Sequence, residues 1–145
     1  VTMSIANRIV LDRTMTESDA PTLDPTNPFF PANNALNSSC TDNITVTFIE
    51  YMDATSVTTN TDNGSCYGTI QVSKDNFASC AQMTNGSPSY SSDNKTFEVK
   101  PVKLIKNNWY KIRATTGITD PSGNPISDNV TTLPFETLGN TGDCK

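Results

Sequence analysis

The sequence predicts an all-β protein folded as an antiparallel β-sandwich of about seven strands. Three segments alternate apolar and polar residues with period two and carry β-branched and aromatic side chains, as half-buried strands do: 44–48, 96–100 and 109–116. Clusters of Gly, Pro, Asn and Ser separate the predicted strands and favour turns. Thr, Ser and Asn supply much of the remaining composition, which suits solvent-facing strand positions better than helices. A helical bundle is therefore disfavoured.

The length and charge of the chain narrow its class further. With 145 residues and 34% hydrophobic content, it has room for one core plus an arm or tail. The formal net charge of −5 argues against nucleic-acid binding, which normally needs a basic surface. The locally basic segment 95–111 alternates its charges with apolar residues, so we interpret it as a solvated strand face.

No membrane-spanning segment is expected, because no apolar run approaches the roughly 18 residues that a membrane span needs. The chain starts without Met. We therefore leave open a removed signal peptide, a removed N-terminal anchor that tethers the protein to a membrane, or a preceding domain.

Residues 1–30 are predicted to form an N-terminal arm and a proline-rich linker, followed by the sandwich domain over residues 31–145. Residues 1–11 contain a candidate strand. Phe29 and Phe30 are too apolar for a solvated spacer, so this piece is expected to lie along the sandwich as an edge segment. The prolines of the linker remove backbone donors and favour an extended conformation; they are Pro21, Pro25, Pro28 and Pro31.

The first clear strand begins at residue 44 and ends at residue 50. Asp53 follows it at a position where its carboxylate can cap a short helical turn. That turn brings the chain back to the core, so we expect Phe48, Met52 and Val57 to be buried.

Two further strands are predicted before the chain reaches its C-terminal half. Residues 67–73 form a strand with Ile70 and Val72 facing inward, and residues 77–83 are expected to return beside it as a hairpin with a bulge or a longer loop. Residues 84–94 are predicted to be a loop.

The C-terminal half contains the strongest alternation. In the segment 109–116, one face carries Tyr110, Ile112 and Ala114, while the other carries Trp109 with charged residues. A closing strand is predicted around residues 133–135, where Pro134 confines it to an edge or a bulge.

Four cysteines without any histidine or C-x-x-C pair favour disulfides over zinc, and an oxidising compartment. Three connectivities are possible. The order of the strands favours a bond between Cys66 and Cys80 across the predicted hairpin, and a bond between Cys40 and Cys144 that staples the C-terminus to the body. Four free buried thiols are the alternative.

The chain resembles the bacterial Ig-like domain of the S-layer SbsA type over roughly residues 31–137. The resemblance implies an Ig-like sandwich that acts as a non-enzymatic structural or adhesive module of a secreted or surface protein, with neighbouring Ig-like domains. The matching positions include Ile44, Val46, Phe48, Glu50, Met52, Asp53, Phe97, Val99, Pro101, Leu104, Tyr110, Ile112, Asp120, Gly123, Asn124, Pro125, Phe135 and Thr137.

Two local patterns extend this resemblance. The spacing of Cys66, Gly68, Phe77 and Cys80 is similar to a cysteine-bearing version in spirochaete surface lipoproteins, which implies a location outside the cell, at the outer membrane or in the periplasm. Tyr110, six residues after a leucine, resembles the tyrosine corner of Ig-type sandwiches, in which the hydroxyl bonds back to the chain just upstream.

Little catalytic chemistry is expected. The absence of histidine removes the commonest general base, and Glu50 with Asp53 is better interpreted as capping and solvation than as a catalytic pair. We therefore expect neither an enzyme nor a cofactor. Oxygen-bearing residues at alternate positions of one loop form a weak calcium candidate: Asp120, Ser122, Asn124 and Asp128.

The main rival to a structural role is a ligand-binding module for a protein or glycan. Exposed aromatic side chains would carry it, with Trp109 and Tyr90 as the candidate contacts.

Overall fold

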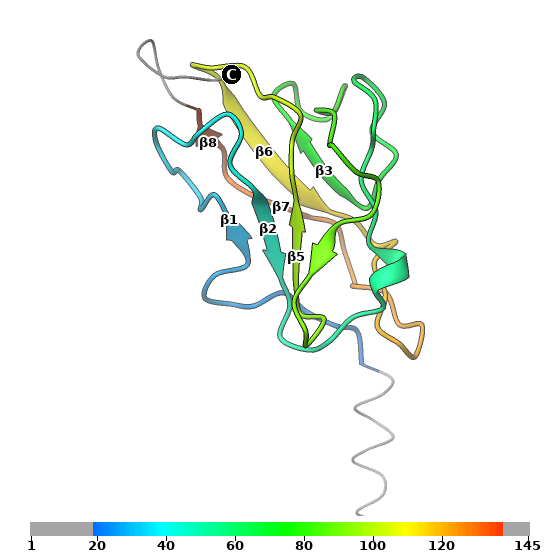
Figure 1. Cartoon of the computed structure of the whole chain (residues 1–145). Helices are drawn as coiled ribbons and strands as arrows, with labels where there is room; N and C mark the ends of the chain where they lie inside the picture. Colours follow the sequence, from blue (N-terminus) through cyan, green and yellow to red (C-terminus); the bar gives the residue numbers. More distant parts are fainter. Residues whose placement is uncertain (1–18, 138–145) are drawn as a thin grey trace, which may run out of the picture.

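The computed structural model describes residues 19–137, which form two antiparallel sheets packed against each other (Figure 1). This arrangement confirms the prediction of an all-β sandwich with an Ig-like architecture. The candidate strand at residues 1–11 lies outside the described residues. The first sheet has the order β1-β2-β5-β4, with β1 (Phe29–Phe30), β2 (Ile44–Thr47), β5 (Thr96–Val99) and β4 (Ser89–Tyr90).

The second sheet is centred on β6 (Trp109–Ala114). It pairs with β3 (Ile70–Ser73) on one side, and with β7 (Val130–Thr131) and β8 (Phe135–Glu136) in succession on the other. Pro134 lies between the last two strands. Among the named strands β8 pairs only with β6. Its other side is not an open edge, because Glu136 N–H donates to the Ala35 carbonyl at 2.7 Å and the Glu136 carbonyl accepts from Ser38 N–H at 2.9 Å. Within residues 19–137, no helix is both long and apolar enough to cross a membrane.

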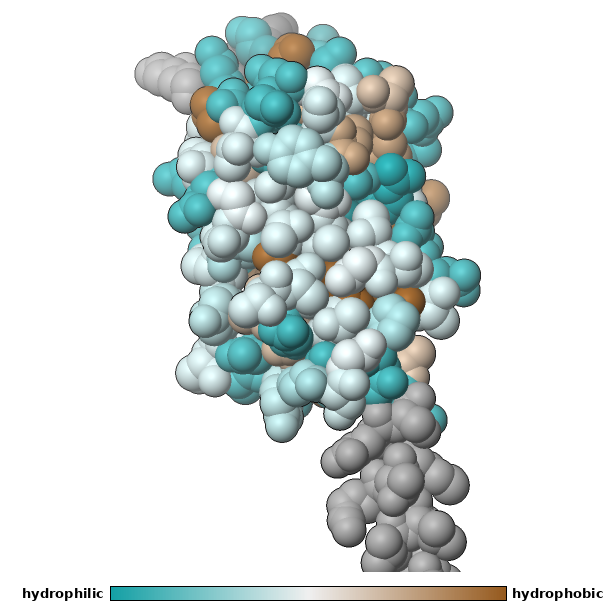
Figure 2. Space-filling model, turned by 90° about the vertical axis from the view of Figure 1, so that its right-hand side faces the viewer, coloured by the Kyte–Doolittle hydropathy of each residue, from teal (hydrophilic) through white to brown (hydrophobic). Residues whose placement is uncertain are grey.

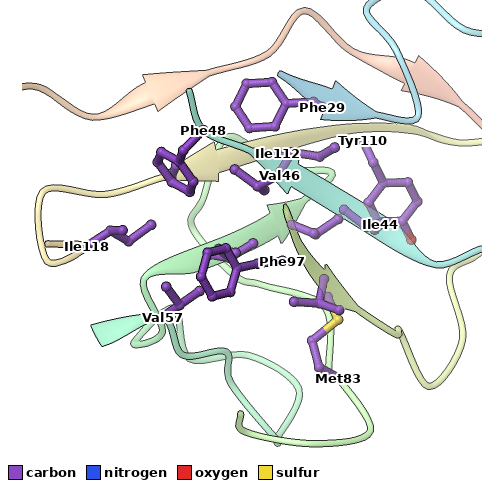
Figure 3. Packing of buried hydrophobic residues seen from close by; sticks show 14 of the residues in the cluster. Phe29, Ile44, Val46, Phe48, Val57, Met83, Phe97, Tyr110, Ile112 and Ile118 are labelled. Atoms are coloured by element: carbon purple, nitrogen blue, oxygen red, sulfur yellow. The ribbon is translucent and has the colours of Figure 1, made fainter. Parts of the chain in front are cut away.

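Side chains that point inward from the strands of both sheets fill the space between the sheets and form the core (Figure 3). Val46, Phe97 and Ile112 are fully buried there, and the rings of Phe48 and Phe97 meet edge to face with centroids 6.1 Å apart. Burial of each such side chain contributes about 1.5–3 kcal/mol. The alternation visible in the sequence therefore specifies which face of each strand packs inward.

The segment that follows β2 is folded as predicted. Phe48, Met52 and Val57 are all buried. The short 3-10 helix η1 (Ala54–Ser56) begins after Asp53, whose Oδ1 accepts a hydrogen bond from the backbone N–H of Thr55 at 3.0 Å. This cap turns the chain so that its flanking apolar residues return to the core.

The predicted hairpin partner of β3 is wrong, because β3 pairs with β6 and residues 77–83 form no strand. Asn76 and Phe77 have positive φ values of 58° and 66°, which an extended strand does not allow. The Ser73 hydroxyl accepts from the Phe77 N–H at 2.9 Å, so side chains replace strand partners in this turn. A single short contact remains beside β3, where Ala81 N–H donates to the Val72 carbonyl at 2.8 Å.

Two other segments take part in the sandwich: the predicted loop 84–94, which was not expected to, and the segment of Phe29 and Phe30, which lies at an edge as expected. The predicted loop 84–94 contains β4, which pairs with β5. Phe29 and Phe30 form β1 at the edge of the first sheet, beside β2, and Leu23 makes a bridge to Phe48. The sandwich thus includes residues that precede the predicted boundary at residue 31.

The tyrosine corner is present at the start of β6. The Tyr110 hydroxyl accepts a hydrogen bond from the backbone N–H of Ile105 at 2.9 Å. The Thr137 hydroxyl donates to the Ile105 carbonyl at 2.7 Å, which ties the last described residue to the same corner. The described chain begins at the lower end of the sandwich in Figure 1 and ends at its upper end.

Candidate functional site

Trp109 and Tyr90, the two expected ligand contacts, are both open to solvent. Trp109 is 45% exposed and Tyr90 is 54% exposed. Trp109 begins β6 in the second sheet, whereas Tyr90 ends β4 at the edge of the first sheet. Because they belong to different sheets, they do not combine into one aromatic platform.

The aromatic contacts around these residues are local. Tyr90 packs on Phe97 with ring centroids 5.8 Å apart, so its ring covers the edge of the core. Arg113, which alternates onto the same face as Trp109, lies instead over Phe77, with the guanidinium carbon 4.0 Å from the ring centre. A ligand contact at Trp109 or Tyr90 stays a prediction.

The weak calcium candidate is organised as a turn around one buried carboxylate. Asp120 accepts hydrogen bonds from the N–H groups of Ser122 and Asn124, each at 2.9 Å, and from the Asn124 side chain at 3.0 Å. Gly123 has φ +90°, which glycine adopts without strain. Burial alone raises the pKa of Asp120, but these hydrogen bonds outweigh it and lower the pKa.

This bonding gives the Asp120 carboxylate a structural role that needs no ion. Asp128, the other acid of the candidate set, is exposed. Among the described residues, no group of three Cys, Asp or Glu side chains is arranged to hold a metal ion. Calcium binding here stays a prediction, tested by whether added calcium raises the melting temperature.

Glu50 and Asp53 lie at the lower end of the sandwich, where several loops meet. Asp53 caps η1, as expected. The pKa of Glu50 is raised, first by partial burial and then by the negative charges of Asp120 and Asp19. Glu50 therefore belongs to a group of acidic side chains that repel one another.

The structure contains the disulfide between Cys66 and Cys80, with 5.1 Å between the Cα atoms. Beside it, Gly64 and Cys80 exchange two backbone hydrogen bonds, each of 3.2 Å. Cys40 is buried, and its expected partner Cys144 lies outside the described residues, so that pairing stays a prediction.

A groove of about 350 Å³ lies between the disulfide and the tyrosine corner, and we call it the lysine groove. Its lining includes Lys74, Lys103, Asn63, Cys80, Ile105 and Tyr110. Burial raises the pKa of Tyr110, although the hydrogen bond from the Ile105 N–H opposes this rise. One wall of the groove is thus held by the disulfide and another by the corner.

The two lysines of the groove come from distant segments, after β3 and between β5 and β6. Both are exposed, and neither forms an ion pair or a hydrogen bond with a described residue. Sequence reasoning noticed the basic character of residues 95–111 but missed Lys74, because only the pairing of β3 with β6 brings it close. No pattern of neighbouring residues in the sequence could therefore have predicted this groove.

The remaining surface offers little to an apolar partner. Figure 2 shows a face that is mostly hydrophilic or intermediate in hydropathy, with hydrophobic residues in small separate spots. Such scattered apolar groups are normal on protein surfaces.

Comparison with known proteins identifies the family to which this fold belongs. A family model described as bacterial Ig-like domain matches residues 17–137. No curated protein is similar enough in sequence to count as a match.

Two solved structures share the fold. The crystal structure of the S-layer protein rSbsC(31-844) is 14% identical, with a TM-score of 0.53, and the match covers 88% of this chain and 15% of that chain. The crystal structure of the N-terminal part of the bacterial S-layer protein SbsC is 13% identical, also with a TM-score of 0.53, and the match covers 93% of this chain and 29% of that one. The chain therefore corresponds to less than a third of the length of either.

Proposed function

Because this chain belongs to the bacterial Ig-like domain family, we propose that it is a structural module of a longer bacterial surface protein, without enzymatic activity. It acts as a spacer outside the cell, separating the parts of the protein that precede and follow it. The observation that carries this proposal is the position of the two ends of the described chain at opposite ends of the sandwich (Figure 1). A module with this geometry adds its full length to a tandem array.

The packing of the module supports a structural role for the chain. The hydrophobic cluster runs through both sheets, from Phe29 on β1 to Phe135 on β8. The tyrosine corner and the disulfide reinforce the upper end, where the described chain leaves the sandwich. Bacterial Ig-like domains are typically structural, and the chain has no histidine to serve as a general base.

Domain replacement in the full-length protein tests this proposal. The segment is deleted or replaced by an unrelated sandwich of similar length with ends at opposite poles. A spacer role predicts that deletion impairs the activity of the whole protein on the cell surface and that the unrelated sandwich restores it. If only the native segment restores activity, the spacer role is refuted and a specific binding role takes its place.

An adhesive or glycan-binding role is the second candidate, and the exposure of Trp109 and Tyr90 favours it. A screen against matrix proteins and glycans, with and without reductant, tests it using Trp109→Ser and Tyr90→Ser. Tyr51→Ser serves as the control, since Tyr51 is also an exposed aromatic residue but lies on a loop outside β4 and β6. Binding that the first two variants reduce and the control does not supports this role.

A further inference from the structure

The lysine groove lies at the end of the sandwich from which the described chain departs. Ile105, which lines the groove, accepts the hydrogen bond from the Thr137 hydroxyl at 2.7 Å. The last described residue therefore lies close to the groove. The groove is also lined by two exposed lysines, Lys74 and Lys103. Lys74 lies near the carboxylate of Asp75, whose pKa is lowered first by hydrogen bonds and then also by this lysine, and neither lysine forms a salt bridge among the described residues.

The opposite end of the sandwich has the complementary charge. Backbone hydrogen bonds join its loops: Asp53 N–H donates to the Thr119 carbonyl, and Met52 N–H donates to the Asn94 carbonyl, each at 2.9 Å. The loops 19–22, 49–53, 91–95 and 117–128 meet there, and together they carry six carboxylates and a single lysine. We call this part of the molecule the acidic end.

Three of these carboxylates are free to meet a partner. Asp19 and Asp128 are exposed and Glu50 is partly exposed, and none of the three accepts a turn-forming hydrogen bond from a described residue. The raised pKa of Glu50, caused by partial burial and then by neighbouring acids, means that a cation placed beside it relieves repulsion.

From this arrangement we infer that the lysine groove receives the acidic end of a second copy of this chain, so that modules dock head to tail. The inference rests on the proposed spacer role and gives it an interface. Opposite charges attract across the contact, whereas two acidic ends repel each other, so the arrangement favours a single polarity. The contact is small and weak between free molecules, and a tether between consecutive modules strengthens it through effective concentration.

Zero-length carbodiimide crosslinking at low ionic strength tests the docking directly. A mixture of unlabelled and ¹⁵N-labelled chains separates links between molecules from links within one. We expect mixed-isotope links that join Lys74 or Lys103 to Glu50 or Asp128, and we expect these links to fade in high salt because the charges are screened. Mixed-isotope links that are absent, or that involve Lys106 as often as the groove lysines, overturn the inference.

Charge reversal provides the matched controls. Lys74→Glu with Lys103→Glu, or Glu50→Lys with Asp128→Lys, should each reduce self-association at low ionic strength several-fold, whereas Lys106→Glu outside the groove should not. Sedimentation measures this association, because the substitutions also remove the groups that carbodiimide joins. Unfolding curves first establish that each variant is folded. Mixing the two reversed variants should restore association, because the exchanged charges attract again; failure to restore it in folded variants refutes the docking.

The outcome is separable from that of the domain-replacement experiment. Modules that do not crosslink still act as spacers if an unrelated sandwich restores the activity of the whole protein. Binding of polyglutamate to the groove without any mixed-isotope link identifies an anionic partner other than a second copy and overturns the inference.

Discussion

Removal of one hydroxyl group tests whether the tyrosine corner stabilises the domain. In Tyr110→Phe, the backbone N–H of Ile105 loses the acceptor that now lies 2.9 Å away. A buried donor left without a partner costs about 1–3 kcal/mol. Ile105 is 53% exposed, so water reaches part of this corner and we expect the lower part of that range, about 1–2 kcal/mol.

Urea denaturation measures this loss. With a typical m-value of about 2 kcal/mol/M, the midpoint should fall by about 0.5–1 M while the slope stays unchanged. Tyr90→Phe is the control, because Tyr90 is exposed and its hydroxyl forms no hydrogen bond among the described residues; it should change stability by less than about 0.5 kcal/mol. Hydrogen exchange at the Ile105 amide should accelerate only in Tyr110→Phe. Equal effects of the two substitutions, or an unchanged midpoint for Tyr110→Phe, would refute the reasoning.

Three further predictions concern the core, the disulfide and the acidic end. Met52→Asp should destabilise the domain by more than about 3 kcal/mol, because it buries an unpaired charge, while Tyr51→Asp on the surface should be nearly neutral; a stably folded Met52→Asp variant would show that this side chain tolerates water. Replacing Cys66 and Cys80 by Ser should cost about 3 kcal/mol, since the bond closes a loop of 14 residues, and unfolding of the native chain in reductant should show the same loss. Glu50→Gln should raise stability at neutral pH: the raised pKa means that the folded state binds more protons than the unfolded state just above pH 4.5, so native stability falls as pH rises through that window. A pH series of melting temperatures in which the two curves do not converge below pH 4.5 would contradict this assignment.

The parts of the fold that follow from the sequence are those set by short-range patterns. Period-two alternation identified the inward residues of β2, β5 and β6, because burial on one face of a strand constrains every second residue. The cap at Asp53 was equally visible, since its donor lies two residues away. Features of this kind depend only on residues that are close together in the sequence.

Strand partners and the groove are set by long-range pairing instead. The turn after β3 contains positive φ values at Asn76 and Phe77, which composition does not reveal, and these divert the chain away from the predicted hairpin. Lys74 and Lys103 meet only because β3 pairs with β6. The sequence leaves open whether Trp109 packs on its own strand face or lies open beside Tyr90, and the separation of these two side chains onto two sheets depends on the same topology.

The loops of this domain explain its acidity in a way that the net charge alone does not. Half of the twelve acidic residues in the described part accept backbone N–H groups within their own turns: Asp24, Asp42, Asp53, Asp75, Asp93 and Asp120. Hydrogen bonds lower the pKa of Asp75 to about 2 and also lower that of Asp93. A sequence pI near 4.5 is therefore in part a consequence of how the chain reverses direction. The turns at Asp75, Asp93 and Asp120, whose pKa values are lowered by these hydrogen bonds, should consequently keep their ionised carboxylates, and with them their shape, as the pH falls through the usual range of a carboxyl group.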